Sequence, residues 1–534
     1  MNTPLPLRVI LLLLLLLQPV FAKPYPSLDD LRAARKEALH RQRRVIFNND
    51  GNEPVYAMQE LSAEALLNLR TAPLAGSQVD SLFYCTWSSG FGLFTHGTKI
   101  GQLFATKEAL FAPNRTVELI EAGIDPLQVM AGFARKNRME LFWSFRMNDT
   151  HDGSKTEYGP IMLRANKLKT EHPDWMIGSE TEKPKFGAWT AVDYTRPEIR
   201  NLAFQFTEEV CRNYDVDGVE LDFFRHPVFF KRAALSGTPC TDEERSLMTD
   251  LIRRIRSMTE SVGQQRGKPI LLAVRVPDST EYASACGLDI ERWLSEGLLD
   301  LLIASGYFQL NPWETTAQLG HRYGVKVYPS LDESRVRDEK ARALRSSIPA
   351  YRGRSAAAFA AGMDGVYLFN SFNPKNPIWR EIGSKEKLAS LDKDYFASAR
   401  GLGAAAGGAL PHAPFVNIPT LNPAKPISIP PTQTASCSFQ AGSESNQSAE
   451  VALLLQISGT PNSSANPSEL STQLSPQLNG HPLPQGSPQP DGWIHFKAQK
   501  EWLRVGQNEV TLTAPASLSK PLQWTDLRCT VRYQ

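Results

Sequence analysis

Eight short apolar runs alternate with helical patterns along residues 44–372, and this alternation constrains the fold more than any other feature. Each run has the length and composition of a buried strand. The runs are RVIFNNDG (44–51), SLFYCTWS (81–88), MELFWSFRMND (139–149), DGVELDFF (217–224), ILLAVRVP (270–277), LDLLIASGYF (299–308), KVYPSLDE (326–333) and DGVYLFNSF (364–372). Strands that alternate with helices predict a parallel sheet.

Helical patterns occupy the segments between these runs. They lie at 62–70, 124–137, 196–214, 241–262 and 289–297, with shorter candidates at 313–322 and 354–362. Thr241 and Glu244 have the spacing of a capping box, which marks a helix start. Eight such units without a dinucleotide-type glycine fingerprint predict an α/β fold of the (β/α)8 barrel (TIM barrel) type over residues 23–400.

The amino-acid composition of the sequence changes after residue 400. Residues 401–433 are rich in Gly, Ala and Pro and predict a linker or strap. Residues 434–534 hold short alternating runs separated by Asn, Gly, Pro and Ser, which predict a β-sandwich. The sequence therefore indicates a barrel followed by a smaller all-β region.

Residues 1–22 have the features of a cleaved secretory signal peptide. One positive charge precedes a short apolar run, and a Val-Phe-Ala ending follows it. The run is short for a bilayer span, so an uncleaved anchor is the minor alternative. Export permits disulfides, and Cys437 and Cys529 bracket the last hundred residues. A bridge between them is expected, with two buried thiols as the alternative.

The charge balance gives no reason to expect a nucleic-acid or anionic-membrane partner. Lys and Arg total 58 against 56 Asp and Glu, without a basic block. A neutral polymer or a small molecule fits better. No histidine-rich or cysteine-rich cluster has metal-ligand spacing, so no cofactor is expected, and the oligomeric state stays open.

Polar and aromatic residues converge on one end of the predicted barrel. They stand at or just after the carboxyl ends of the strands, where barrel enzymes place their catalytic groups. These residues are Asn48, Asp50, Tyr84, Trp87, Arg146, Asn148, Arg275, Tyr307, Ser330, Asp332 and Asn370. Aromatic faces stack on sugar rings, and amides, arginines and acids bind hydroxyl groups, so the mixture favours a carbohydrate substrate.

The stretch VDGVELDFFRHP (216–227) carries two acids on one face of the fourth strand. If Val219 and Leu221 face the helices, then Glu220 and Asp222 point inward, with Asp222 nearer the mouth. Glycoside cleavage needs a proton donor and a carboxylate that attacks the sugar or activates water. Asp222 is the first candidate nucleophile or base. Glu220, Asp332 and Glu333 are candidates for the partner acid.

Structural roles compete with these assignments. Glu220 is also suited to a buried ion pair with Arg275, and Asp222 to a contact with Arg225 or with backbone amides. Trp87 and Trp313, near predicted loops, are the candidate sugar platforms. Asp149, His151, Arg225 and His226 lie in loops at the same end and complete the candidate substrate-binding set.

The motifs RVIFNNDG, FWSFRMNDTHD, VDGVELDFFRHP, AVRVP and YLFNSF, in that order, resemble those of the secreted bacterial glycosyl-hydrolase-like (family 10-like) barrel proteins. The resemblance covers roughly residues 40–400, and the Asp-Gly-x-x-x-Asp pattern ending at Asp222 is its most specific part. It implies a (β/α)8 barrel and a carbohydrate substrate.

Three functions follow as hypotheses. The leading one is a glycoside hydrolase. The second is a glycan-binding barrel without catalysis, which the absence of an unambiguous acid pair motivates. The third is a metal-dependent hydrolase or deacetylase that uses Asp149, His151 and Asp152.

Overall fold

A parallel sheet of eight strands forms the first part of the molecule. The computed structural model describes residues 23–87, 90–400, 410–458 and 471–534. The strands, in sheet order, are β10 (Val366–Leu368), β1 (Val45–Asp50), β2 (Val79–Cys85), β5 (Glu140–Arg146), β6 (Gly218–Asp222), β7 (Leu271–Val276), β8 (Leu301–Ala304) and β9 (Lys326–Pro329). A bridge between Ser330 and Tyr367 joins the two edges. The eight predicted strands and the barrel are confirmed.

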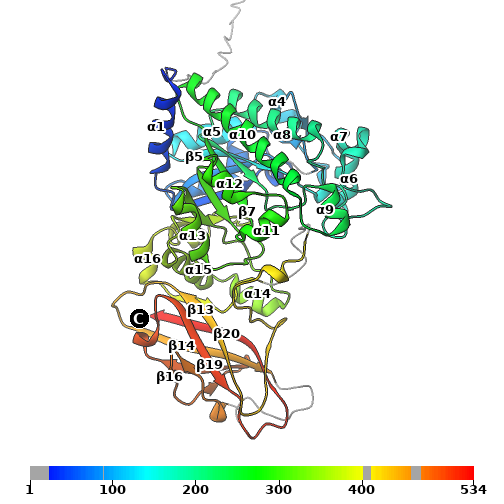
Figure 1. Cartoon of the computed structure of the whole chain (residues 1–534). Coiled ribbons are helices and arrows are strands. Elements are labelled where there is room, and N and C mark those ends of the chain that lie inside the picture. The colour runs from blue at the N-terminus through cyan, green and yellow to red at the C-terminus, as the bar shows by residue number, and fades with distance from the viewer. Residues whose placement is uncertain (1–22, 88–89, 401–409, 459–470) are drawn as a thin grey trace, which may run out of the picture.

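Helices surround this sheet (Figure 1). Those predicted from the sequence are α3 (Ala63–Arg70), α5 (Pro126–Lys136), α8 (Pro197–Asn213), α10 (Asp242–Arg266), α12 (Ile290–Ser295), α13 (Trp313–Arg322) and α15 (Ile348–Ala360). The capping box of Thr241 and Glu244 is present at the start of α10. Further helices are α1 (Leu28–Leu39), α2 (Asn52–Ala57), α4 (Thr116–Glu121), α6 (Tyr158–Ala165), α7 (Lys167–Glu171), α9 (Lys231–Ser236), α11 (Thr280–Ala285), α14 (Glu339–Arg345) and α16 (Lys385–Ala389).

Side chains alternate between the two faces of each barrel strand. On β6, Val219 and Leu221 pack in the large core that includes the helices. The opposite face of the sheet contributes a second core inside the barrel, with Phe83 and Phe142 stacked at a centroid distance of 4.3 Å. The period of two places Glu220 and Asp222 on this inward face, opposite to Val219 and Leu221.

Two antiparallel sheets form the C-terminal region. One contains β11 (Lys393–Phe396), β20 (Leu522–Tyr533), β14 (Ala449–Ser458), β18 (Trp493–Ala498) and β17 (Ser487–Pro488), with β12 (Ile427–Ile429) also paired to β20. The other contains β13 (Thr434–Ala441), β19 (Gly506–Thr513), β15 (Gln477–Leu478) and β16 (His481–Pro482). Their inner faces share one apolar core, so this region is a β-sandwich.

The sandwich sheet recruits chain from outside the predicted 434–534 range. Strand β11 falls within the segment expected to belong to the barrel, and β12 falls within the expected linker or strap. Residues 401–409 of that linker lie outside the described residues. We place the boundary between barrel and sandwich just before Lys393, because β11 pairs with β20 and with no barrel strand among the described residues.

The expected disulfide between Cys437 and Cys529 is wrong in this structure. Both thiols are free and buried, Cys437 on β13 and Cys529 on β20, which lie in the two facing sheets. The Cys437 thiol donates to its neighbour's carbonyl, that of Ser438. The two residues fill apolar core volume, which is the usual role of a buried free cysteine.

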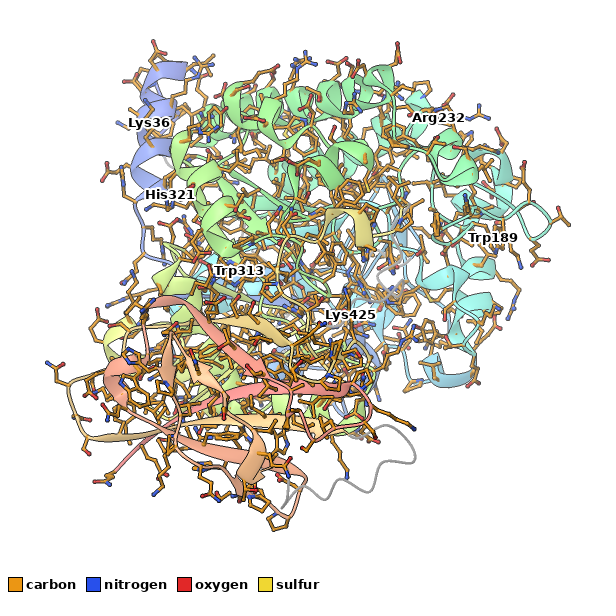
Figure 2. The ribbon with its side chains drawn as sticks, turned by 60° about the horizontal axis from the view of Figure 1, so that its bottom comes forward. Lys36, Trp189, Arg232, Trp313, His321 and Lys425 are labelled. Atoms are coloured by element: carbon orange, nitrogen blue, oxygen red, sulfur yellow. The ribbon has the colours of Figure 1, made fainter. Side chains whose placement is uncertain are left out.

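The barrel and the sandwich meet at helices α13, α14 and α15. Trp313, at the start of α13, lies at this boundary (Figure 2). It lines a hollow of about 100 Å³ together with Tyr395 of β11 and Phe439 of β13. Arg345 of α14 forms a buried ion pair with Asp526 of β20.

No helix among the described residues is long and apolar enough to cross a membrane. The predicted signal peptide, residues 1–22, lies outside the described residues.

Candidate functional site

The acid-rich motif on β6 places its two carboxylates inside the barrel. Asp222 stands opposite Arg146 of β5 and Arg275 of β7 in the strand register, and Glu220 lies one layer deeper. Both side chains are almost fully buried. The structure therefore has Glu220 and Asp222 pointing into the barrel, as the alternation along β6 predicted.

Glu220 is held in its protonated form. Its Oε2 accepts hydrogen bonds from Ser144 Oγ (2.5 Å), Asn48 Nδ2 (3.1 Å) and the Tyr367 hydroxyl (3.1 Å). Burial, and then the nearby Asp222 charge, raise the pKa of Glu220 to about 8. Its Oε1 is buried and has no hydrogen-bond partner among the described residues.

Arg275 links two other carboxylates across the mouth. Its Nη1 lies 3.4 Å from Asp222 Oδ2, and its Nη2 lies 3.1 Å from Asp332 Oδ2. The expected Glu220–Arg275 ion pair does not form in the described structure, because Arg275 pairs one layer above Glu220. Asp222 Oδ1 also accepts the backbone N–H groups of Phe224 and Arg225 at 3.0 and 3.1 Å. The alternative of Asp222 as a cap for backbone amides is thus realised.

A pocket of about 220 Å³ opens beside this network. Its wall combines an acid, an arginine and a histidine with aromatic rings, and its lining residues are Asp50, Asn52, Tyr56, Trp87, Leu110, Phe111, Arg146, His151 and Tyr158. Asp50 ends β1, Arg146 ends β5 and His151 follows β5, so the pocket lies at the carboxyl end of the barrel.

Asp50 is the carboxylate that faces this pocket, with 13% of its side chain exposed. Its Oδ2 accepts a hydrogen bond from Arg146 Nη2 at 2.5 Å, and its Oδ1 has no partner among the described residues. Burial alone would raise the pKa of Asp50, but the charges of Arg146 and then Arg70 outweigh it and hold the pKa below its ordinary value. Asp50 is therefore an ionised acid with one buried oxygen that has no partner among the described residues.

His151 is fixed between two charged groups. Its Nδ1 lies 2.7 Å from Asp149 Oδ1, and its Nε2 lies 2.7 Å from Arg225 Nη2. Asp149 is ionised, because His151 and Arg146 hold its pKa well below the usual range despite burial. Nδ1 therefore carries the proton that is donated to Asp149, and the bare Nε2 accepts from Arg225.

Asp149, His151 and His226 form the one group of possible metal ligands found among the described residues. Their ligand atoms lie within 4.8 Å of one another. Arg146 and Arg225, however, donate directly to Asp149 and His151, and two guanidinium charges at this distance oppose a divalent cation. Asp152, the third expected ligand, instead pairs with Lys169 at 2.6 Å. The donor set fits a hydrogen-bonded network better than a metal centre.

Two further mouth residues gather around Arg225. Its Nη1 donates to the Tyr307 hydroxyl, and Asn370 Nδ2 donates to the same oxygen at 3.1 Å. Asn370, the second residue after β10, has a φ of 56°, a left-handed backbone conformation that Asn tolerates better than most residues.

Several predicted site residues lie elsewhere. Tyr84 is buried in the core between strands and helices, and Asn148 binds the backbone of Val192 and Val228, so it clamps loops. Trp313 lies at the sandwich boundary, and Glu333 pairs with Arg335 in an exposed loop. His226 Nδ1 accepts the Thr150 N–H at 3.2 Å, which ties the loops after β5 and β6 together.

Seven residues of the site were not predicted: Asn52, Tyr56, Leu110, Phe111 and Tyr158 of the pocket wall, and Ser144 and Tyr367 beside Glu220. Tyr56 and Tyr158 line the pocket from short helices that carry no strand-end signal, whereas Ser144 and Tyr367 bind Glu220 from inside the barrel. The alternation on β5 and β10 already places Ser144 and Tyr367 on the inward face. That signal is present in the sequence.

The comparison with protein families gives a match over part of this barrel. Residues 69–234 match the family Glycosyl hydrolase-like 10. This range contains β2, β5 and β6, with Arg146, His151, Asp222 and Arg225, so the resemblance predicted from the motifs is confirmed. Over residues 69–234 the chain is similar to glycosyl-hydrolase-like proteins.

Matches to individual proteins are more distant. A segment of 123 residues is 31% identical to chitinase A1 of Niallia circulans and covers 22% of this chain and 16% of that protein. The PgaB (BpsB) glycoside hydrolase domain from Bordetella bronchiseptica aligns with a TM-score of 0.40 at 10% identity, over 64% of this chain and 99% of its own. A family 18 N-acetylglucosaminidase from Paenibacillus barengoltzii aligns with a TM-score of 0.33 at 13% identity, over 62% and 95%.

Proposed function

We propose that the protein is a glycoside hydrolase whose substrate binds in the pocket at the carboxyl end of the barrel. The observation that carries the proposal is Asp50: an ionised carboxylate, with 13% of its side chain exposed, on the wall of a pocket that also holds aromatic rings. Such rings stack on sugar faces, and a carboxylate beside them is the group that glycoside cleavage needs.

The two acids needed for cleavage are assigned by their protonation. Asp50 acts as the ionised group that attacks the anomeric carbon or takes a proton from water. Glu220 carries a proton at neutral pH, and its neighbour Asp222 stands beside Arg146 of the pocket wall. The Glu220–Asp222 pair supplies the proton that the leaving oxygen takes up, and the pair is reprotonated when Asp50 returns its proton or when water hydrolyses the sugar–enzyme ester.

Arg146 holds Asp50 in place and keeps it ionised. Its guanidinium contacts Asp50 and Asp149 at 2.5 and 3.0 Å. A positive charge beside the attacking carboxylate lowers its basicity, but it also fixes the carboxylate's orientation, which is the larger requirement in a preorganised site. Asp332 and Glu333, candidates from the sequence, have no place in this scheme: Asp332 is closed off by Arg275, and Glu333 lies in a loop.

The second candidate function is glycan binding without cleavage. It is favoured by one observation: Asp222 and Asp332 are buried and share the charge of a single arginine, as acids with a structural role would.

A product screen tests the proposal. The purified chain is incubated with a panel of bacterial, plant and algal polysaccharides, and released oligosaccharides are measured by mass spectrometry beside the Asp50→Asn and Asp222→Asn variants. Release by the wild type, with a ~100-fold or greater loss in Asp50→Asn, supports it. Loss in Asp222→Asn alone moves the attacking carboxylate to Asp222, as predicted from the sequence. Retention on a glycan without products from any substrate establishes the binding function instead.

We also propose that the protein is exported, from the charge and apolar pattern of residues 1–22. N-terminal sequencing of the protein isolated from a producing bacterium tests this. Cleavage gives Lys23 as the first residue, whereas an intact Met1 in the cytoplasmic fraction contradicts export.

A further inference from the structure

Arg225, beside the pocket, has more hydrogen-bond donors than the protein uses. A guanidinium carries five N–H groups, and those of Arg225 make two side-chain contacts, with the Tyr307 hydroxyl and His151 Nε2. Its Nε is buried and has no partner. No Asp or Glu in the described part of the chain forms an ion pair with it. A half-buried arginine without an acid partner is unusual, because burial disfavours an unpaired charge.

The groups around Arg225 are also donors. The Tyr307 oxygen accepts from both Arg225 and Asn370 Nδ2, so its own O–H proton is left to donate. Asn370 retains a second N–H on the same nitrogen. Arg225, Tyr307 and Asn370, from the loops after β6, β8 and β10, thus form one hydrogen-bonded cluster with donors to spare, and an anion is the ligand that such a set accepts.

The Arg225 guanidinium is held in position before any ligand arrives. Its central carbon lies 5.0 Å from the Tyr307 ring centroid and 5.6 Å from that of Phe369. The Arg225 backbone N–H donates to Asp222 Oδ1, and the guanidinium donates to His151. A fixed guanidinium loses little conformational entropy on binding a planar carboxylate.

His151 connects this donor cluster to the pocket. It lines the pocket through its ring and contacts Arg225 through Nε2. A sugar in the pocket therefore lies next to the donor cluster formed by Arg225, Tyr307 and Asn370.

We propose that the glycan substrate is acidic, and that the donor cluster binds a carboxylate of the sugar residue adjoining the pocket. This rests on the proposed function and specifies its substrate class as carboxylate-bearing sugars. The charge balance of the whole chain favoured a neutral polymer, but a count over the whole chain does not reveal a local excess of hydrogen-bond donors.

Matched polymers test the inference. Binding of the full chain to polygalacturonate and to hyaluronate is measured by affinity electrophoresis, each beside its methyl ester, in which the same chain has lost its charge. For at least one pair, the wild type is expected to bind the acid about 10-fold or more tightly than the ester. In Arg225→Gln this ratio falls to near one.

Arg335→Gln is the matched control. Arg335 stacks on the same Tyr307 ring at 4.1 Å, but it is paired with Glu333. Both variants remove one positive charge, so non-specific attraction of the polymer changes equally in the two. The acid-to-ester ratio stays high in Arg335→Gln if the donor cluster is the anion site.

The outcomes separate this inference from the proposed function. A wild-type ratio near one for both polymer pairs, or a ratio that Arg225→Gln leaves unchanged, overturns the inference even if a neutral glycan is cleaved. Tight binding of an acid form without product supports the anion site and removes the hydrolase. If Arg225→Gln does not fold by circular dichroism, Tyr307→Phe replaces it, and the ratio is expected to fall about 3-fold or more with one donor lost.

Discussion

Two buried arginines show how the barrel–sandwich junction differs from the barrel mouth. At the junction, Arg345 binds Asp526 with two parallel hydrogen bonds of 2.7 and 2.8 Å. Its remaining donors reach the carbonyls of Ser398, Ala341 and Leu421. Every nitrogen of this guanidinium has a partner.

At the mouth, Arg275 is equally buried but less completely bound. It makes single contacts of 3.4 and 3.1 Å with Asp222 and Asp332, and its Nε has no partner among the described residues. It also lies 4.0 Å from the Phe369 ring centroid. The junction therefore has the complete satisfaction expected of a structural ion pair, whereas the mouth keeps spare donors and acceptors, as sites that bind ligands do.

Removal of the junction acid is expected to have the largest effect. Asp526→Asn leaves Arg345 buried beside a neutral amide and is predicted to lower the free energy of unfolding by about 3–5 kcal/mol. Urea unfolding followed by tryptophan fluorescence measures it. The control replaces both partners, Arg345→Met with Asp526→Leu, and is predicted to lose less than the single variant. An equal loss contradicts the ion-pair explanation.

A pH-dependent effect at Glu220 comes second. Its folded pKa is about 8, above the unfolded value, so between about pH 4.5 and 8 the folded state holds a proton that the unfolded state lacks. The contribution of Glu220 to the free energy of unfolding of the wild type is therefore fully present at low pH. It falls by about 1.4 kcal/mol per pH unit across that window. Glu220→Gln removes the dependence, so its stability relative to wild type is predicted to rise by about 2–3 kcal/mol from pH 6 to pH 8. Parallel urea titrations at the two pH values measure it, and a constant difference contradicts it.

Replacing Asp332 at the mouth is expected to lower the free energy of unfolding less than replacing Asp526 at the junction. Asp332→Asn removes one charged contact of Arg275, while Asp222 still balances that arginine. A loss of about 1–2 kcal/mol is expected. If urea unfolding gives the same loss as Asp526→Asn, then the mouth is as tightly satisfied as the junction and the contrast fails.

The smallest effect belongs to an exposed pair. Glu333 and Arg335 contact each other at 3.0 Å, with 47% and 43% of their side chains exposed. Glu333→Gln is predicted to change the free energy of unfolding by no more than about 0.5 kcal/mol, because solvent screens such pairs. A larger change in the same urea assay would give this loop a structural role that its exposure does not suggest.

The strands and the orientation of their side chains could be predicted because both depend on local pattern. Apolar runs set the positions of the eight strands, and the period of two placed Glu220 and Asp222 inside the barrel. Partners across the barrel depend on register and shear instead, so Arg275 was paired with Glu220 although it binds Asp222 and Asp332. Asp50 was identified as a polar strand end, but part of the pocket beside it is formed by α2 and α6, whose positions no short-range pattern encodes.

The prediction of a linker or strap at residues 401–433 missed a strand for a related reason. The composition of this segment predicts irregular chain, yet β12 within it and β11 before it pair with β20. A short strand with few apolar residues is recognisable only by the neighbour that completes its hydrogen bonds.

The sheet order of the sandwich also determines when this region can fold. Strand β20 lies between β11 and β14, and Asp394 of β11 binds Arg528 of β20, 134 residues further along the chain. During synthesis, β11 therefore leaves the ribosome without the strand that will hold it, and Arg345 emerges without Asp526. All eight barrel strands precede β20 in the chain, so the barrel can fold before β20 is available to cover the junction surface. A chain that ends before residue 522 lacks both the strand that pairs with β11 and the acid that pairs with Arg345.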